Sequence, residues 1–217
     1  MEIKGYYDLS VTLETNMPVW PTNPLVTINP VGTVARDAYN VESYSSVTHS
    51  GTHIDAPYHM VEKGMTVDAI PLQQIIGEGY CISPKLNGKE ITEKMLESIW
   101  KPEYDGKIIL IKTGWDKKRD FSREFQYEFP GLSMDSVDFI VKHKPKMIGI
   151  DTLGMEPYDH SGFDVHHALL GKNIVFIEDL AHLDQLKEEK KYLIVALPLK
   201  IKKGSGSMAR VVALDVY

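Results

Sequence analysis

Cysteine is nearly absent from this 217-residue chain: Cys81 is the only one, so no disulfide can form within it. A chain without disulfides suits a reducing compartment, and Cys81 is explained more simply as a small buried side chain than as a nucleophile. The sequence also has no apolar run near the ~20 residues that span a bilayer. Its opening, MEIKGYYDLS, lacks the apolar core of a signal peptide. We therefore predict a cytoplasmic protein with no membrane partner.

Excess positive charge is lacking too. The net charge is −6, which gives no electrostatic reason to expect nucleic acid as a partner. The Gly-x-Ser-x-Gly motif of serine hydrolases is absent, and residues 202–207 lack the spacing of a phosphate-binding loop, so we interpret them as a flexible loop. With 43% hydrophobic and 25% charged residues the composition is that of an ordinary globular protein, and we predict one domain over residues 1–217.

The pattern of apolar residues predicts an α/β fold. Strands dominate the N-terminal half and alternate with helices in the C-terminal half, which predicts a mixed, partly barrel-like sheet with flanking helices. Thr92, Ser133 and Asp164 are candidate helix caps, and Gly171 is a candidate C-terminal stop. Helices are predicted at 90–100, 133–143 and 165–170, a short strand or turn at 71–77, and strands at 6–13, 25–30, 41–49, 107–113, 146–151, 173–178, 192–199 and 209–217.

Residues 49–59, HSGTHIDAPYH, are the most informative stretch, because four potential metal ligands fall at odd positions within it. A helix is disfavoured by Gly51 and Pro57. A strand would place alternate residues on one face, but a straight strand would hold His49 about 20 Å from Asp55, too far to share a metal ion. We therefore predict a bend at Gly51. The four candidates are His49, His53, Asp55 and His59.

Further candidates lie downstream. His166 shares a helix face with two leucines and is predicted to point inward, whereas His167 lies about 100° around the helix. Glu178 ends the apolar run NIVFI, where a carboxylate is costly unless it is paired or bound to metal. A lone helical histidine or strand-end glutamate is more often structural, so both interpretations stay open here. Trp20, in a proline-rich loop, offers either an aromatic wall for a substrate or simple packing.

The spacing His-x-Gly-Thr-His-x-Asp-x-Pro-x-His resembles the signature of the cyclase-type metal-dependent hydrolases, a family that includes bacterial kynurenine formamidase (arylformamidase) and isatin hydrolase. The likeness extends to the Asp-Leu-Ser opening, the Pro-Val-Trp-Pro loop, the Gly-Ile-Asp turn at 149–151, and the spacing of His166 and Glu178. It covers most of the chain. The resemblance implies a swivelling β/β/α domain, dimers or tetramers with sites near subunit contacts, and Trp20 near the substrate pocket.

The resemblance also implies a two-metal site, usually with zinc, although isatin-hydrolase-like members use manganese. His49, His53 and Asp55 would hold one ion, and Asp55 would bridge to a second ion held by His166 and Glu178. His59 would be the catalytic acid/base residue rather than a ligand. The implied activity is hydrolysis of N-formylkynurenine to kynurenine and formate by a metal-activated water, a step of tryptophan catabolism. Hydrolysis of another amide or cyclic amide, and metal binding without turnover, are the alternatives.

Overall fold

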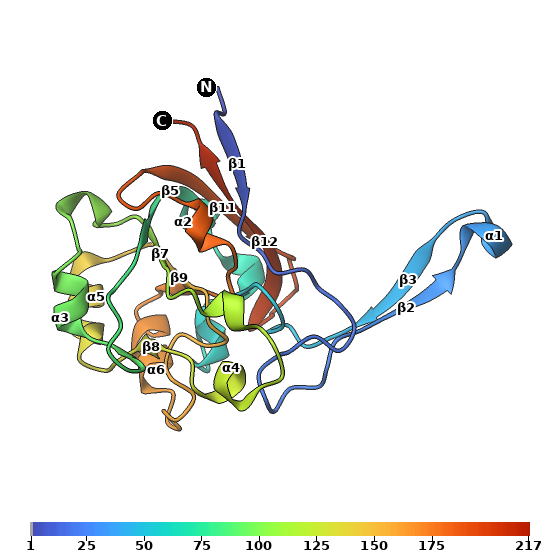
Figure 1. Cartoon of the computed structure of the whole chain (residues 1–217), viewed down its shortest axis with the longest axis horizontal. Coiled ribbons are helices and arrows are strands. Elements are labelled where there is room, and N and C mark those ends of the chain that lie inside the picture. Colours follow the sequence, from blue (N-terminus) through green and yellow to red (C-terminus); the bar gives the residue numbers. More distant parts are fainter. Residues whose placement is uncertain (1) are drawn as a thin grey trace.

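A sheet of eight strands forms the centre of the molecule, seen in a computed structural model that describes residues 2–217. The strand order is β1-β12-β11-β5-β7-β9-β10-β4, and β4 also pairs with β12. All strands but β1 therefore close into a barrel, which confirms the predicted mixed, partly barrel-like sheet (Figure 1). The strands are β1 (Gly5–Asp8), β4 (His53–Asp55), β5 (Ile76–Ile82), β7 (Ile108–Ile111), β9 (Met147–Ile150), β10 (Val175–Glu178), β11 (Tyr192–Pro198) and β12 (Gly206–Asp215).

The sheet has a parallel part and an antiparallel part. Strands β5, β7, β9 and β10 are parallel to their neighbours in that order, whereas β4, β11, β12 and β1 make antiparallel pairs. The parallel strands β7, β9 and β10 are buried along their whole length. That burial is why they are continuous apolar runs, since both faces of a parallel sheet are covered.

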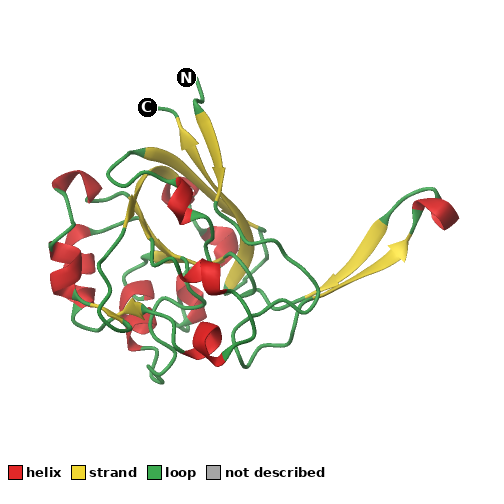
Figure 2. Ribbon diagram, in the orientation of Figure 1, coloured by secondary structure: helices red, strands yellow, loops and turns green. Residues whose placement is uncertain are grey.

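Two apolar cores lie on opposite faces of the barrel wall. Ile108 and Leu110 of β7 belong to the core inside the barrel, and Ile109 and Ile111 to the core beneath the helices, because side chains alternate along a strand. The helices are α1 (Val34–Asp37), α2 (Leu72–Ile75), α3 (Glu93–Glu97), α4 (Arg123–Tyr127), α5 (Ser136–His143) and α6 (Asp164–Leu170). The helices that carry Leu96, Ile140 and Leu169 pack on the outer face of the sheet, and Figure 1 shows α3 and α5 outside the curled sheet; Figure 2 shows the same arrangement coloured by helix and strand.

All three predicted helices start later or are capped differently than the sequence predicts. The helix predicted at 90–100 spans only Glu93–Glu97, because Glu90–Ile91 pair as a short strand with Gly131–Leu132. The Thr92 cap is confirmed, since its Oγ1 accepts the Met95 N–H at 3.4 Å. Helix α5 begins three residues late, at Ser136, because the Ser133 hydroxyl donates to the Ile91 carbonyl at 2.9 Å and caps nothing. Asp164 is the first residue of α6 and not its cap.

The predicted stop of α6 at Gly171 is confirmed, although Gly171 has φ −63°, in the right-handed region, so the turn does not need the conformational freedom of glycine. Other boundaries differ from the prediction. Residues 72–75 are helical and lead directly into β5, which the prediction missed. Two glycines in IGEGYCI hide the strand pattern, and Gly79 is needed because a Cβ there would lie 2.7 Å from the Ile108 oxygen. Strand β12 begins at Gly206, inside the predicted flexible loop, because it pairs with β4.

A two-stranded arm projects from the barrel (Figure 1). It consists of β2 (Thr27–Gly32) and β3 (Val41–Ser45), with α1 at its tip. A second small sheet joins β6 (Glu90–Ile91) to β8 (Gly131–Leu132). Short 3-10 turns complete the fold at Pro57–His59, Val67–Ala69, Pro102–Tyr104, Trp115–Lys118 and Leu183–Gln185. Across residues 2–217, no helix has the length and apolar character needed to cross a bilayer.

Candidate metal centre

Strand β4 positions the first two candidate ligands. It lies between β10 and β12, so that His53 is the register partner of Glu178. His53 and Asp55 share one face of the strand, and the His53 Nε2 atom lies 3.3 Å from Asp55 Oδ1 and 3.5 Å from Glu178 Oε2. The other ring nitrogen, Nδ1, is 2.7 Å from the Gly51 carbonyl oxygen, which therefore holds it as the N–H donor and leaves Nε2 facing the carboxylates.

The predicted bend at Gly51 is confirmed. Gly51 has φ +60°, and a Cβ there would lie 2.8 Å from the Leu13 side chain, so both the backbone and the space require glycine. The bend folds His49 back onto β4, where its Nδ1 lies 2.7 Å from Asp55 Oδ1. A strand over the whole of 49–59 would have kept these atoms apart; only residues 53–55 are extended as a strand.

The far side of the His49 ring meets the start of β12. Its Nε2 lies 3.0 Å from the Ser205 hydroxyl. A Cβ on Gly206 would lie 2.6 Å from the ring, so glycine is required for the ring to sit there. The segment interpreted as a flexible loop is thus part of the site. No sequence pattern marks Ser205 or Gly206 as part of the site, because only the pairing of β12 with β4 brings them next to His49.

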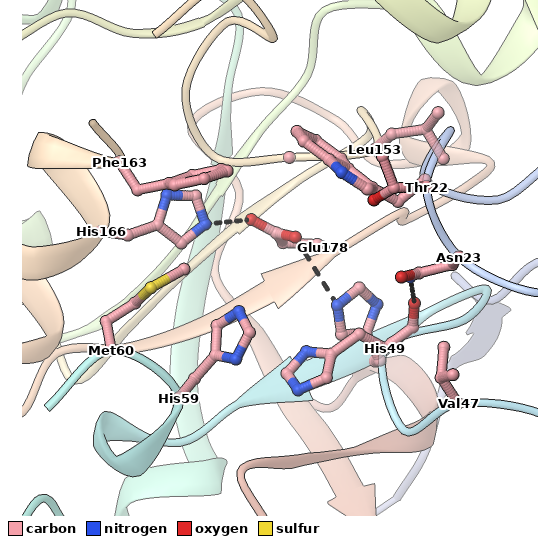
Figure 3. Close-up of a pocket in the computed structure, with 13 residues that line it drawn as sticks. Thr22, Asn23, Val47, His49, His59, Met60, Leu153, Phe163, His166 and Glu178 are labelled. Carbon is pink, nitrogen blue, oxygen red and sulfur yellow. Dashed lines mark hydrogen bonds and ion pairs between the residues drawn. The ribbon is translucent and has the colours of Figure 1, made fainter. Parts of the chain in front are cut away.

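His59 lies on the 3-10 turn that follows β4. Its ring stacks on His49 with centroids 4.0 Å apart and an interplanar angle of 27° (Figure 3). Ligand atoms of His49, Asp55 and His59 converge within 4.8 Å of one another, and so do those of His53, Asp55 and Glu178. The residues alone made His59 one of four candidate ligands, and the family resemblance implied an acid/base role instead; its ring lies beside His49 and Asp55.

Helix α6 contributes His166 from the opposite side. His166 is buried and His167 exposed, so the predicted orientation of the two rings is confirmed. The His166 Nε2 atom lies 3.0 Å from Glu178 Oε1 and 3.9 Å from Asp55 Oδ2. Figure 3 shows His166 and Glu178 facing each other across the pocket. Histidines and carboxylates far apart in the sequence are therefore gathered at one point.

The shared carboxylate is the best test of whether a cation fits. Asp55 is fully buried, and its Oδ2 atom has no hydrogen-bond partner among the described residues. A buried carboxylate oxygen without a partner is costly. Asp55 also belongs to both convergent groups. Imidazoles and carboxylates together suit zinc or a related divalent ion, so the donor set fits a metal cofactor.

The carboxylates and histidines of the site shift one another's pKa values, because they lie close together. Burial opposes ionisation of Asp55, yet the histidines His49, His59 and His53 outweigh it and hold the pKa of Asp55 well below its usual range. Burial likewise opposes charge on His53, but Asp55 and Glu178 prevail and raise its pKa to about 8. The region thus favours a carboxylate beside positive charge, which is the role a metal ion fills.

The pKa values of His166 and His59 are shifted in opposite directions. Burial opposes charge on His166, but hydrogen bonds with Glu156 and Glu178 raise its pKa to about 10. For His59 burial dominates over the attraction of Asp55 and lowers its pKa to about 4. His59 is the more open of the two rings, since it is half-buried at the edge of the pocket and His166 is enclosed.

An apolar pocket of about 290 Å³ opens beside these groups. Trp20 lines it and also packs against Phe129, Tyr158 and Phe163, with centroids 5.1–6.0 Å apart. The same ring therefore packs against other aromatic side chains and faces the cavity, and its contact with a substrate stays a prediction. The pocket residues that the sequence did not reveal are Thr22, Asn23, Val47, Met60, Leu153, Gly154 and Phe163.

Comparison with known proteins agrees with this geometry. The family model described as putative cyclase matches residues 7–157. A kynurenine formamidase from Bacillus cereus (strain ATCC 14579) is 28% identical, with 98% of each chain covered. A solved structure described as a potential metal-dependent hydrolase with cyclase activity is 27% identical, covers 98% of each chain and has a TM-score of 0.82. An isatin hydrolase bound to thioisatinate has a TM-score of 0.87 at 23% identity, covering 98% of this chain and 92% of its own, and shares the fold.

The barrel and the converging histidines and carboxylates define the class: this protein is a metal-dependent hydrolase. The family follows from the match over residues 7–157, which is more than half of the chain. The chain belongs to the cyclase family, as the signature at 49–59 indicated.

Proposed function

We propose that this protein hydrolyses an aryl amide, with N-formylkynurenine as the first candidate substrate and kynurenine and formate as products. The relative from Bacillus cereus is named for that reaction. The observation that carries the proposal is the shared carboxylate: Asp55 belongs to two groups of ligand-type atoms at the mouth of an aromatic pocket. A hydrolytic centre next to an aromatic wall suits an amide attached to an aromatic ring.

The proposed metal centre holds two divalent ions per chain. His49, His53 and Asp55 would hold one, and Asp55, His166 and Glu178 the other. Zinc is the first candidate and manganese the second, because both accept imidazole and carboxylate ligands. When bound, such a cation supplies Lewis-acid chemistry, acidifying water and polarising a carbonyl oxygen. Asp55 is common to both convergent groups, His49–Asp55–His59 and His53–Asp55–Glu178, which supports its bridging place. The grouping of His166 with Glu178 is supported by the 3.0 Å distance between His166 Nε2 and Glu178 Oε1.

His59 is the proposed proton carrier. Its ring is half-buried at the pocket edge, stacked on His49 and with its centroid 6.4 Å from that of His166. From this position it can take a proton from the attacking water and pass it to the nitrogen of the leaving amine, which cannot depart as an anion at neutral pH. A ring on a tight turn beginning at Pro57 keeps the orientation that such a transfer needs.

The aromatic wall accounts for substrate binding. Trp20 and Phe163 face the cavity and pack on each other at a centroid distance of 6.0 Å. Met60 and Leu153 complete the apolar lining. An aryl ring placed there would bury apolar surface and stack on the indole, an interaction worth about 0.5–1.5 kcal/mol beyond burial.

A second candidate is a cyclic amide such as isatin. None of the described residues that line the pocket is a lysine or arginine. Apart from the histidines and Glu178 of the metal centre, the polar side chains that line the pocket are the neutral Thr22 and Asn23. The carboxylate of N-formylkynurenine would therefore have no lysine or arginine to pair with, whereas isatin has no carboxylate to bind. The shared fold with an isatin hydrolase is compatible with this candidate.

One panel assay separates these candidates. Purified protein is loaded with zinc or with manganese and offered N-formylkynurenine, isatin and simple aryl formamides. We expect turnover of an aryl formamide with at least one metal. Turnover of isatin alone supports the second candidate. Metal binding without turnover of any member would favour a binding protein and contradict the proposal.

We also propose that the chain forms a homodimer through its arm. The apolar side chains Val31, Val34, Tyr39, Val41 and Tyr44 on the arm are 41–60% exposed. An isolated two-stranded hairpin is marginally stable, so a packing partner is expected. A hollow of about 570 Å³ beside the base of the arm includes the exposed Leu197 and Leu199. A twofold axis would place the arm of each copy on the other.

Light scattering after gel filtration tests the dimer. Val34→Asp with Tyr39→Asp should convert it to a monomer, because both side chains lie on the arm. Leu72→Asp is the matched control, since Leu72 is 60% exposed but lies on α2 away from the arm. A monomeric unmodified chain, or an arm variant that stays dimeric, would contradict the proposal.

A further inference from the structure

Glu156 is a buried carboxylate outside the signature motif. It is 1% exposed, and three hydrogen-bond donors and one further imidazole nitrogen surround it. The His166 ring approaches most closely, with Nδ1 at 2.6 Å from Glu156 Oε1. The backbone N–H groups of His166 and Val165 donate to the same carboxylate at 3.0 and 3.3 Å. The fourth contact is His160 Nδ1 at 3.4 Å.

The loop that carries Glu156 is held firmly in place. The Leu132 N–H of β8 donates to the Met155 carbonyl at 2.7 Å. Gly131 lies so close that a Cβ on it would be 2.6 Å from the Glu156 Cα. The Met155 N–H donates to Glu178 Oε1 at 2.6 Å. Two consecutive residues, Met155 and Glu156, therefore each fix one candidate ligand.

We propose that Glu156 is a positioning residue that fixes the His166 ring for metal binding. This inference rests on the metal centre under "Proposed function". By accepting a hydrogen bond from Nδ1, Glu156 makes that atom the N–H donor and leaves Nε2 unprotonated when metal is bound. The same bond aims Nε2 at Glu178 and Asp55, 3.0 and 3.9 Å away. Carboxylates behind ligand histidines commonly act this way, and their loss costs 10–100-fold in metal affinity or activity.

A purely structural role must be distinguished from positioning. The bonds to the N–H groups of Val165 and His166 stabilise the start of α6, and a structural role would need only those. Positioning depends on the third bond, to the ring. Glu156→Gln can keep an acceptor oxygen toward His166 while it loses the negative charge. Glu156→Ala loses both.

The test measures zinc affinity of the full chain by competition with a chromophoric chelator. We expect Glu156→Ala to weaken zinc binding by about 10–100-fold, and Glu156→Gln to recover at least half of the loss on a logarithmic scale. Asp159→Asn is the matched control, because it removes one carboxylate from the same loop but breaks only an ion pair with Lys89, on a side chain that is 62% exposed. It should bind zinc as the unmodified chain does.

A second measurement needs no variant. In the zinc-loaded unmodified chain, ¹⁵N-detected imidazole NMR should show His166 with a proton on Nδ1 and zinc on Nε2. Zinc on Nδ1 would overturn the proposal, as would Glu156→Ala with zinc affinity within about twofold of the unmodified chain. Glu156→Gln as weak as Glu156→Ala would also overturn it. An unmodified chain that binds zinc but hydrolyses no member of the substrate panel would contradict the proposed function instead, and not the role of Glu156.

Discussion

The shared position of Asp55 gives the sharpest prediction, made for Asp55→Asn. The substitution keeps the shape of a fully buried side chain that touches His49 at 2.7 Å and His53 at 3.3 Å. It removes the charge that both ligand groups use. Because Asp55 belongs to both groups, this single substitution should weaken the binding of both metal ions.

The size of the effect follows from ligand number. Zinc held by about four ligands binds with roughly 10–16 kcal/mol of apparent free energy, or about 3 kcal/mol for each ligand. Loss of one strong ligand should therefore lower the affinity for each ion by about 100-fold, since 1.4 kcal/mol is a factor of ten in affinity. The residual sites should empty on dialysis against a weak chelator.

Elemental analysis after dialysis measures this occupancy. We expect close to two ions for the unmodified chain and fewer than about half an ion for Asp55→Asn. Asp68→Asn is the control, because Asp68 is a half-buried aspartate outside the metal centre that accepts from the Thr66 hydroxyl and the Lys203 N–H. Circular dichroism establishes that the metal-free variant is folded. Full occupancy in a folded Asp55→Asn would refute the bridging role.

Three further predictions concern other parts of the molecule. His59→Ala should keep its metal and lose about 10²–10⁴-fold in kcat, the usual contribution of a general acid–base group; unchanged turnover would remove His59 from the reaction. Trp20→Ala should raise KM about tenfold with a smaller change in kcat, because the stacking surface is lost, whereas Trp20→Phe should recover most of the affinity; equal kinetics in all three proteins would exclude contact with substrate. Glu78→Gln should destabilise the fold by at most about 1 kcal/mol at pH 7, since the side chains of Glu78, Lys107 and Lys191 are each 33–34% exposed to solvent, which screens the ion pairs. Hydrogen bonds from Lys107 and Lys191 lower the Glu78 pKa to about 2, so its stabilisation is present above its unfolded value near 4.5 and should be lost as pH falls toward 2; denaturation curves that differ equally at pH 7 and pH 2.5 would contradict this.

Local chemistry made much of the candidate site accessible from the sequence. The spacing of His49, His53 and Asp55 required a bend, and Gly51 was the residue able to supply it. The inward face of His166 followed from its spacing to two leucines. Glu178 stood out because a carboxylate at the end of an apolar run needs a partner, and the structure supplies His53 and His166 as partners.

The rest of the site depends on tertiary pairing that no local pattern encodes. Ser205 reaches His49 only because β12 pairs with β4. Glu156, and not the predicted cap Asp164, accepts the backbone N–H groups of Val165 and His166 at the start of α6, because the preceding loop folds back over the helix. Strand β5 was missed for a related reason: its glycines are selected by the approach of neighbouring strands, and they weaken the strand pattern.

We propose that metal held by Asp55 and its neighbouring histidines enables hydrolysis of an aryl amide. The most direct test is formate release from an aryl formamide by chelator-stripped protein, before and after zinc or manganese is returned. We expect no release above background from the stripped protein and restored turnover on addition of metal. Equal rates of formate release with and without metal would contradict the account.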